Sequence, residues 1–230
     1  MTTRHEMTAG SQSLSPCCVP PDDAEHHEVS PEQISLFKVP LGCEAAGGLG
    51  CGVKAKPILQ GLAREPAVAQ ACLNRSGTMI AVLWRESVAP KVGGEHVRSI
   101  LAEQGLAARE LTGAVRESAL REFSSGADWY RGDAVDRLST EEAGIIAARL
   151  LRRVTAKVPL SDGTIETLLA VFAEVCRHQL IDRPLTSARL RRKLIANELL
   201  KVGRQHLHGI AFKALQEAVA LGHRPVKGEK

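Results

Sequence analysis

The sequence has few aromatic residues and no long apolar run, and both features limit what the chain can be. Aromatic residues make up 3% of the 230 residues, whereas hydrophobic residues as a whole make up 44%. A core can therefore form, but it must consist mainly of Leu, Val, Ile and Ala, which favours a largely helical packing. No run of about 18 apolar residues is present, and the first residues lack the apolar core of a secretory signal. We therefore expect a cytoplasmic protein with no membrane span.

The sequence also lacks the motifs of several enzyme classes. It has no phosphate-binding Walker loop, no Gly-x-Ser-x-Gly turn and no His-Glu-x-x-His zinc motif. The formal net charge of +4 is too small for composition alone to indicate a nucleic acid or an acidic membrane as the partner. These absences favour a non-catalytic protein and leave the enzyme question open.

Four segments of different character follow one another along the chain. Residues 1–33 are polar and rich in proline without a helical or strand period, so we interpret them as a disordered tail. Residues 34–112 mix strand and helix patterns, residues 113–222 carry helical patterns broken by Gly and Pro, and residues 223–230 form a basic tail. Because domains commonly contain about 100–150 residues, the two central segments predict two domains.

The pattern of residues 34–112 predicts six elements. A strand begins at Ile34, a glycine-rich loop follows over residues 41–52, and apolar residues at helical spacing predict a helix over 53–64. Ser76-Gly77 separates two strand-like runs and predicts a hairpin. A second helix ends at Gly105, and LAARELT supplies the last strand. The order β-α-β-β-α-β is that of the split βαβ of ferredoxin-like domains, so the sequence predicts an α+β protein.

The second half predicts a small helical bundle. AVRESALREF is a short helix and SSGADWYRGD a loop, and the spacing of Ser139 and Glu142 predicts a capping box at the head of the next helix. Asp162 is the expected N-cap of the following helix, and two more helices cover about 185–202 and 204–221. The faces expected to point inward carry Ile145, Ile146, Leu150, Val154, Ile165, Leu168, Leu169, Phe172, Val175 and Cys176.

Two of the six cysteines lie in the glycine-rich loop. In a reducing cytosol, cysteines serve as thiols, metal ligands or buried apolar residues, and Cys72 on a hairpin strand is expected in the core. At the first turn of a helix, unpaired amides lower the pKa of Cys51, and Lys54 and Lys56 strengthen this effect. Together with Cys43, the loop suits a soft ion such as Cu(I), Hg(II) or Zn(II).

The segments GLGCGVKAKPIL and LNRSGTMIAVLW, in this order of elements, resemble the heavy-metal-associated domain family, the metallochaperone fold, over about residues 34–112. That family carries a Met-x-Cys-x-x-Cys loop between its first strand and first helix. Cys51 matches the first family cysteine, Leu49 stands in place of the methionine, and Lys54 in place of the second cysteine. Cys43, eight positions upstream, replaces that second thiol only if the loop folds back. The resemblance implies a ferredoxin-like domain that binds Cu, Zn or Hg.

Other soft ligands lie outside the loop. Two pairs occur in the tail, and four residues of the helical segment contain the N and S ligands of a tetrahedral zinc site. Residues two apart on a helix point in different directions, so the second set needs irregular turns to converge. The tail set can equally be incidental, and the alternative for the second set is a packed cysteine with solvated histidines. The two sets are Cys17, Cys18, His26 and His27 in the tail, and Cys176, His178, His206 and His208 in the helices.

A basic cluster occupies the helix predicted near residue 185. Such a helix can bind phosphates or an acidic partner protein, although a basic run is also typical of a solvated face and no base-reading motif is present. The candidate residues are Arg189, Arg191, Arg192 and Lys193.

Three functional hypotheses follow. In the first, the protein handles or senses a soft metal ion through Cys51 and Cys43, and the helical domain docks to a protein partner. The second is a non-catalytic regulatory or adaptor protein that acts through the basic helical domain. The third is a thiol redox protein that uses Cys51 as its nucleophile.

Overall fold

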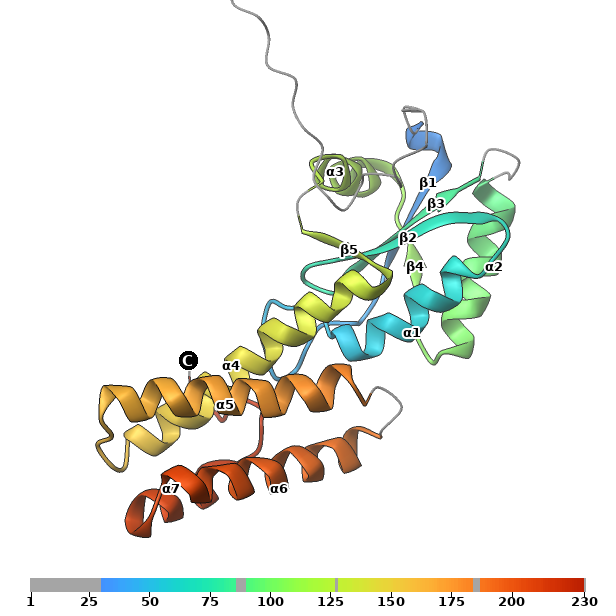
Figure 1. The fold of residues 1–230 in the computed structure, drawn as a ribbon. Helices are drawn as coiled ribbons and strands as arrows, with labels where there is room; N and C mark the ends of the chain where they lie inside the picture. The colour runs from blue at the N-terminus through green and yellow to red at the C-terminus, as the bar shows by residue number, and fades with distance from the viewer. Residues whose placement is uncertain (1–29, 86–89, 127, 184–186, 230) are drawn as a thin grey trace, which may run out of the picture.

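The structure is a computed structural model that describes residues 30–85, 90–126, 128–183 and 187–229. Within these ranges, a five-stranded antiparallel sheet and seven α-helices make up a mixed α+β fold (Figure 1). The strands are β1 (Ile34–Lys38), β2 (Val68–Asn74), β3 (Met79–Trp84), β4 (Arg109–Glu110) and β5 (Trp129–Arg131). The helices are α1 (Gly52–Ala63), α2 (Pro90–Glu103), α3 (Gly113–Ser124), α4 (Asp136–Thr155), α5 (Asp162–Ile181), α6 (Ala188–His206) and α7 (Gly209–Ala220). The α+β class is as predicted.

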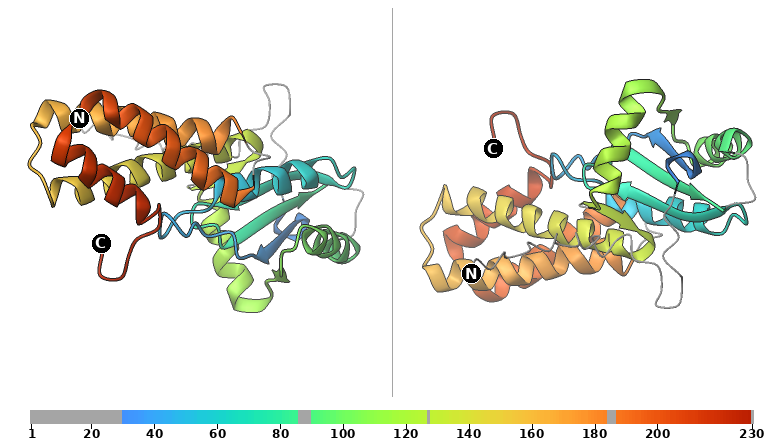
Figure 2. Two further views of the ribbon diagram at one scale, coloured as in Figure 1. Left: turned by 90° about the horizontal axis from the view of Figure 1, so that it is seen from below. Right: turned by 90° about the horizontal axis from the view of Figure 1, so that it is seen from above.

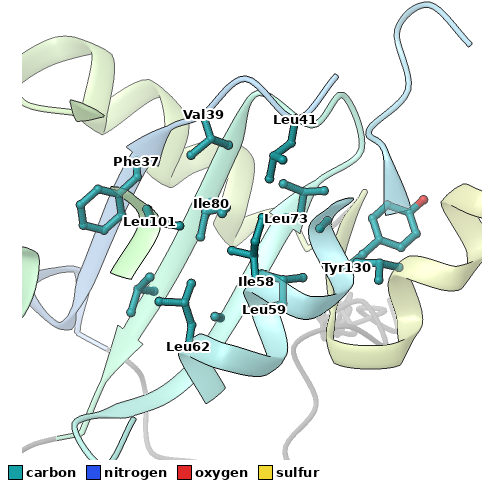
Figure 3. Packing of buried hydrophobic residues seen from close by; sticks show 14 of the residues in the cluster. Phe37, Val39, Leu41, Ile58, Leu59, Leu62, Leu73, Ile80, Leu101 and Tyr130 are labelled. Carbon is teal, nitrogen blue, oxygen red and sulfur yellow. The ribbon is translucent and has the colours of Figure 1, made fainter. Parts of the chain in front are cut away.

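Both faces of the sheet are covered. The strands lie in the order β4-β1-β3-β2-β5, and every neighbouring pair is antiparallel. Because side chains alternate along a strand, Leu36 packs with Phe123 of α3 on one face while Phe37 packs with Leu101 of α2 on the other. Helices α1 and α2 cover that second face, where aliphatic side chains from the sheet and the two helices interdigitate (Figure 3).

Helix α4 joins the sheet to the helical half. Its first turns follow the short 3-10 turn η2 (Gly132–Val135), where Val135 and Leu138 enter the core shared with α1. Its later turns pack with α5, α6 and α7 in a second apolar core that includes Leu150 and Phe172. Figure 2 shows the two halves on opposite sides of this junction. The glycine-rich loop lies there too, since Cys43 contacts both cores.

Several predictions of local structure were wrong in detail. The expected loop SSGADWYRGD contains β5, which pairs with β2. Ser139 and Glu142 do not form a capping box, because α4 already begins at Asp136 and Ser139 packs inside the fold against Gly52. Ser161, not Asp162, caps α5 through a hydrogen bond from the Thr164 amide. 

The ends and faces of other elements also differ from prediction. The last strand is only two residues long, and α6 and α7 begin later than expected. Ile145 and Leu169, expected to point inward, are 37% and 39% exposed. At the edge of the predicted tail, Ser30 caps a 3-10 turn, η1 (Pro31–Gln33).

The turn between β2 and β3 supports the glycine-rich loop. The amide of Leu41 donates to the carbonyl of Gly77, and the amide of Gly50 donates to that of Arg75. Gly77 has a φ of +70°, and a Cβ there would lie 2.5 Å from the carbonyl oxygen of Leu41 and 2.6 Å from the Cα of Gly50. The turn at Gly77 and the glycine-rich loop can therefore lie this close together only because Gly77 has no side chain.

We expect Gly77→Ala to destabilise the fold far more than Gly105→Ala. Gly105 has nearly the same φ, +72°, but no atom lies within 4 Å of a Cβ built there. The control variant therefore isolates the backbone cost, about 1 to 2 kcal/mol, whereas Gly77→Ala adds a clash with backbone and should lose about 3 kcal/mol or more. Urea unfolding followed by circular dichroism measures both. Equal losses would show that the crossing tolerates a side chain.

Candidate thiol site

The glycine-rich loop folds back on itself and places both of its cysteines on one face. Gly42 and Gly50 form an antiparallel bridge, the amide of Cys43 donates to the carbonyl of Leu49 at 2.7 Å, and that of Cys51 donates to Leu41 at 2.7 Å. Opposed residues of such a pair point to the same side, and so do residues two apart on one strand. Cys43 and Cys51 are therefore diagonal neighbours on the same face as two buried leucines, and both thiols are half-buried.

Glu142 of α4 faces the two thiols. Its carboxylate accepts a hydrogen bond from the Cys43 thiol and lies close enough to Cys51 to act on it electrostatically. The residue is only 6% exposed, and its Oε2 has no hydrogen-bond partner among the described residues. Burial raises the pKa of Glu142, and the Cys43 hydrogen bond and the cations Arg191 and Lys54 counteract that shift. The site thus contains a buried, incompletely satisfied acid.

The expectation that the helix terminus lowers the pKa of Cys51 is wrong. Cys51 does occupy the N-cap of α1, but burial, followed by the charge of Glu142, raises its pKa, and the amide and charge of Lys54 offset this only in part. Lys56 does not assist, because its ammonium pairs with Asp136 at 2.7 Å and Asp133 at 3.2 Å. Desolvation therefore outweighs the favourable terminus.

Cys43 is even further from ionisation. Burial first, and then the charge and hydrogen bond of Glu142, raise its pKa to about 12. Cys176 of α5 is completely buried, and burial and Glu142 likewise raise its pKa to about 12. All three cysteines around Glu142 are therefore protonated thiols at neutral pH.

Arg191 brings α6 into the same site. It is half-buried, and both Cys51 and Glu142 act on it electrostatically, which opposes the fall in its pKa caused by burial. In the sequence this residue belonged to the basic cluster, but it lies toward the thiols while Arg189, Arg192 and Lys193 are exposed. The site is thus assembled from the loop, α1, α4 and α6.

A second charged residue of α4 holds the loop to the C-terminal segment. Arg149, 6% exposed, donates from Nη1 to the carbonyl of Ala45 at 2.7 Å and to that of His223 at 2.6 Å. Glu44 of the loop pairs with Arg224.

The C-terminal segment is also tied to α4 through Arg153. Its guanidinium donates two hydrogen bonds to the Glu229 carboxylate, at 2.7 and 2.8 Å. It also donates to the carbonyl oxygens of Gly222 and Arg224. Residues 222–229, most of them in the predicted basic tail, therefore lie docked against α4.

The remaining predicted ligands are scattered. Cys176 is buried, while His178 is exposed with Nδ1 2.6 Å from Asp182, and His206 and His208 are exposed on α6 and just after it. Within the described ranges, no group of three or more His, Cys, Asp or Glu side chains is arranged to hold a metal ion. Cys72 lies in the core as predicted. The candidates Cys17, Cys18, His26 and His27 lie outside the described residues.

Sequence reasoning missed the roles of Glu142 and Arg149. Glu142 precedes Ile146 and Leu150 at steps of four residues, so it occupies a core position of the apolar stripe of α4. A charged residue on such a stripe is costly to bury and is therefore a useful signal. Because Glu142 stands three residues after Ser139, the sequence instead assigns it to a capping box.

We expect Glu142→Gln to lower the pKa of Cys43, because it removes the negative charge beside the thiol. Alkylation by iodoacetamide across pH 7 to 10, quantified by mass spectrometry, reports the thiolate, whose amount rises about tenfold for each unit of fall in the pKa. The matched control is Glu141→Gln, since Glu141 pairs with Arg75 at 2.8 Å. An unchanged profile in Glu142→Gln, or the same change in both variants, would contradict this arrangement.

We also expect the C-terminal segment to undock in acid. Burial, and then the charges of Arg192, Arg153 and Arg149, lower the pKa of His223 from 6.5 to about 4. The neutral imidazole therefore stabilises docking fully above pH 6.5, and this contribution is lost as the pH falls toward 4. Glu229, whose pKa the Arg153 hydrogen bond lowers from 4.5 to about 2, loses its contribution below pH 4.5. The amide NMR signals of residues 222–229 should report increasing mobility of this segment as the pH falls over this range. The variant His223→Gln should lose the pH dependence of docking above pH 4.5. Identical profiles would contradict the role of His223.

Comparisons with protein-family models, with curated proteins and with solved structures returned no match. The described helices include none with the length and apolar character needed to cross a membrane.

Proposed function

We propose that the chain binds a soft metal ion through Cys43 and Cys51. The observation that carries this proposal is the folded-back loop, which presents both thiols on one inward face beside a buried carboxylate. Thiolate sulfur is the ligand that soft ions prefer, and flanking glycines let a loop close around an ion. Cys43 thereby stands in for the second cysteine of the family that the loop resembles.

The number of thiols favours an ion of low coordination number. Cu(I) and Hg(II) accept two thiolates in a linear arrangement, whereas Zn(II) takes four ligands in structural sites. Glu142 supports a cation here, because its buried Oε2 lacks a partner among the described residues and a positive ion between the thiols would face it. We therefore rank Cu(I) and Hg(II) above Zn(II).

The surrounding fold and the cysteines are consistent with this proposal. The strand order β4-β1-β3-β2, with α1 and α2 on one face, supports a ferredoxin-like unit to which β5 has been added. Cys43, Cys51, Cys72 and Cys176 are all free thiols, which supports a reducing, cytoplasmic compartment. The helical half remains the proposed site of docking to a protein partner.

A thiol redox role has less support. The thiolate is the attacking species in such chemistry, and the pKa values of Cys43 and Cys51 are raised rather than lowered. A metal ion can still bind, since it displaces the thiol protons as it coordinates sulfur.

Metal titration of the reduced protein tests the proposal. We expect wild type to bind one equivalent of Cu(I) or Hg(II), measured by competition with a chromophoric chelator, and Cys43→Ser with Cys51→Ser to lose at least about 100-fold in affinity, because both ligands are gone. Zn(II) should bind more weakly. The full chain is used throughout under anaerobic conditions.

The matched control is the double variant Cys17→Ser with Cys18→Ser, which removes the same number of thiols elsewhere in the chain. It should bind as wild type does. Loss of binding in this variant with retention in the loop variant would assign the metal to the N-terminal cysteines, and equal affinity in all three proteins would exclude the loop site.

A further inference from the structure

The outer face of α6 carries a polar row of four cations and one amide, here called the basic stripe. Arg189, Lys193, Asn197 and Lys201 follow one another at intervals of four residues, Arg204 completes the row, and all five are exposed. The opposite face carries the buried Ile195, Leu199 and Gly203. Seen from below in Figure 2 (left), α6 and α7 lie in front of the other helices. At about 1.5 Å per residue, the stripe is about 22 Å long.

The charges of the stripe are largely uncompensated. Within the described part of the chain, no carboxylate pairs with Arg189, Lys193 or Arg204, and Lys201 has a single distant partner, Glu198 at 3.5 Å. Arg189 and Lys193 are four residues apart and Lys201 and Arg204 three apart, so both pairs bring like charges together and destabilise an isolated helix. The negative charges of a bound polyanion would offset this repulsion between the cations.

One end of the stripe is held in position. The guanidinium of Arg204 lies over the ring of Phe212 of α7, 5.1 Å from its centre. This contact restricts a long side chain that would otherwise move freely, while the stacked guanidinium can still donate hydrogen bonds. The cation is thus presented outward at little further entropic cost.

We propose that α6 binds the phosphate backbone of duplex DNA through Arg189, Lys193, Lys201 and Arg204. Contacts to phosphate need only cations and amide donors, which the stripe supplies, Asn197 included. An α-helix about 10 to 12 Å wide fits the major groove of B-form DNA, which is about 12 Å wide. The binding would be mainly independent of base sequence.

Other macromolecules fit this surface less well. A protein interface draws its energy from large apolar or aromatic anchors, and the stripe is polar throughout, with the exposed Leu190 beside one end. The major groove of A-form RNA is too deep and narrow to admit a helix. Charge and shape together therefore favour DNA.

Fluorescence anisotropy of a labelled mixed-sequence duplex of about 24 base pairs, between about 50 and 200 mM NaCl, tests the proposal on the full chain. The variant Arg189→Gln, Lys193→Gln, Lys201→Gln removes three phosphate contacts. It should bind more weakly, and its plot of log K against log salt should be shallower by about 3. Gln keeps a good helix propensity, and circular dichroism verifies the fold.

A matched control removes three other exposed cations, Arg64, Arg121 and Arg137, by substitution with Gln. Its net charge equals that of the stripe variant, so its salt dependence should stay that of wild type. If both variants lost DNA affinity equally, the loss would depend on net charge alone, and the proposal would be overturned. Absence of binding to DNA at the lowest salt, equal binding to an RNA duplex, or stripe-dependent binding of an acidic peptide in place of DNA would also overturn it.

Discussion

The arrangement of the thiol loop depends on the hydrogen bonds that the buried guanidinium of Arg149 donates to two backbone carbonyls. One side chain of α4 donates both to Ala45, between the two loop cysteines, and to His223 near the C-terminus. A buried carbonyl that loses its donor costs about 1 to 3 kcal/mol, so removal of Arg149 would leave one such group in the loop and one in the C-terminal segment. The shape of the loop is therefore set by a helix that lies about a hundred residues further along the chain.

Helix α4 carries buried charges where apolar residues would ordinarily stand. Glu142 and Arg149 are two turns apart on similar faces, and both act on Cys43 or its loop. Buried charges are tolerated when hydrogen bonds replace water. Arg153 meets this condition through carbonyls and Glu229, whereas among the described residues the Nε of Arg149 has no partner and Glu142 has only a thiol for one oxygen. Ionisable groups whose pKa values are shifted by burial and by a charged neighbour occur preferentially at functional sites, and Glu142 and Cys43 are such groups.

Regular periodicity was sufficient to predict the elements around the loop, because Ala55, Ile58 and Leu62 repeat at helical spacing and the Ser76-Gly77 turn separates the hairpin strands. Features that depend on distant partners were not predictable. The three residues of β5 show no period of their own, and only pairing with β2 makes them a strand. Helix α4 starts before its apparent capping box because Leu138 is drawn into the core of the sheet. The raised pKa of Cys51 has the same origin, since burial by another part of the chain leaves no local signal.

Helix α6 connects the thiol site with the basic stripe. Arg191, on its inner side, is coupled electrostatically to Cys51 and Glu142, while Arg189 and Lys193 on the same first turns are exposed. A Cu(I) ion that replaces two thiol protons adds one negative charge near Arg191, and a helix moves as a unit. Metal and DNA would influence each other only if each of them binds two alternative positions of α6 with different affinity, and the coupling would then be equal in both directions. Arg191 is the side chain through which such a difference would act, because it connects the thiol site to the helix that bears the stripe.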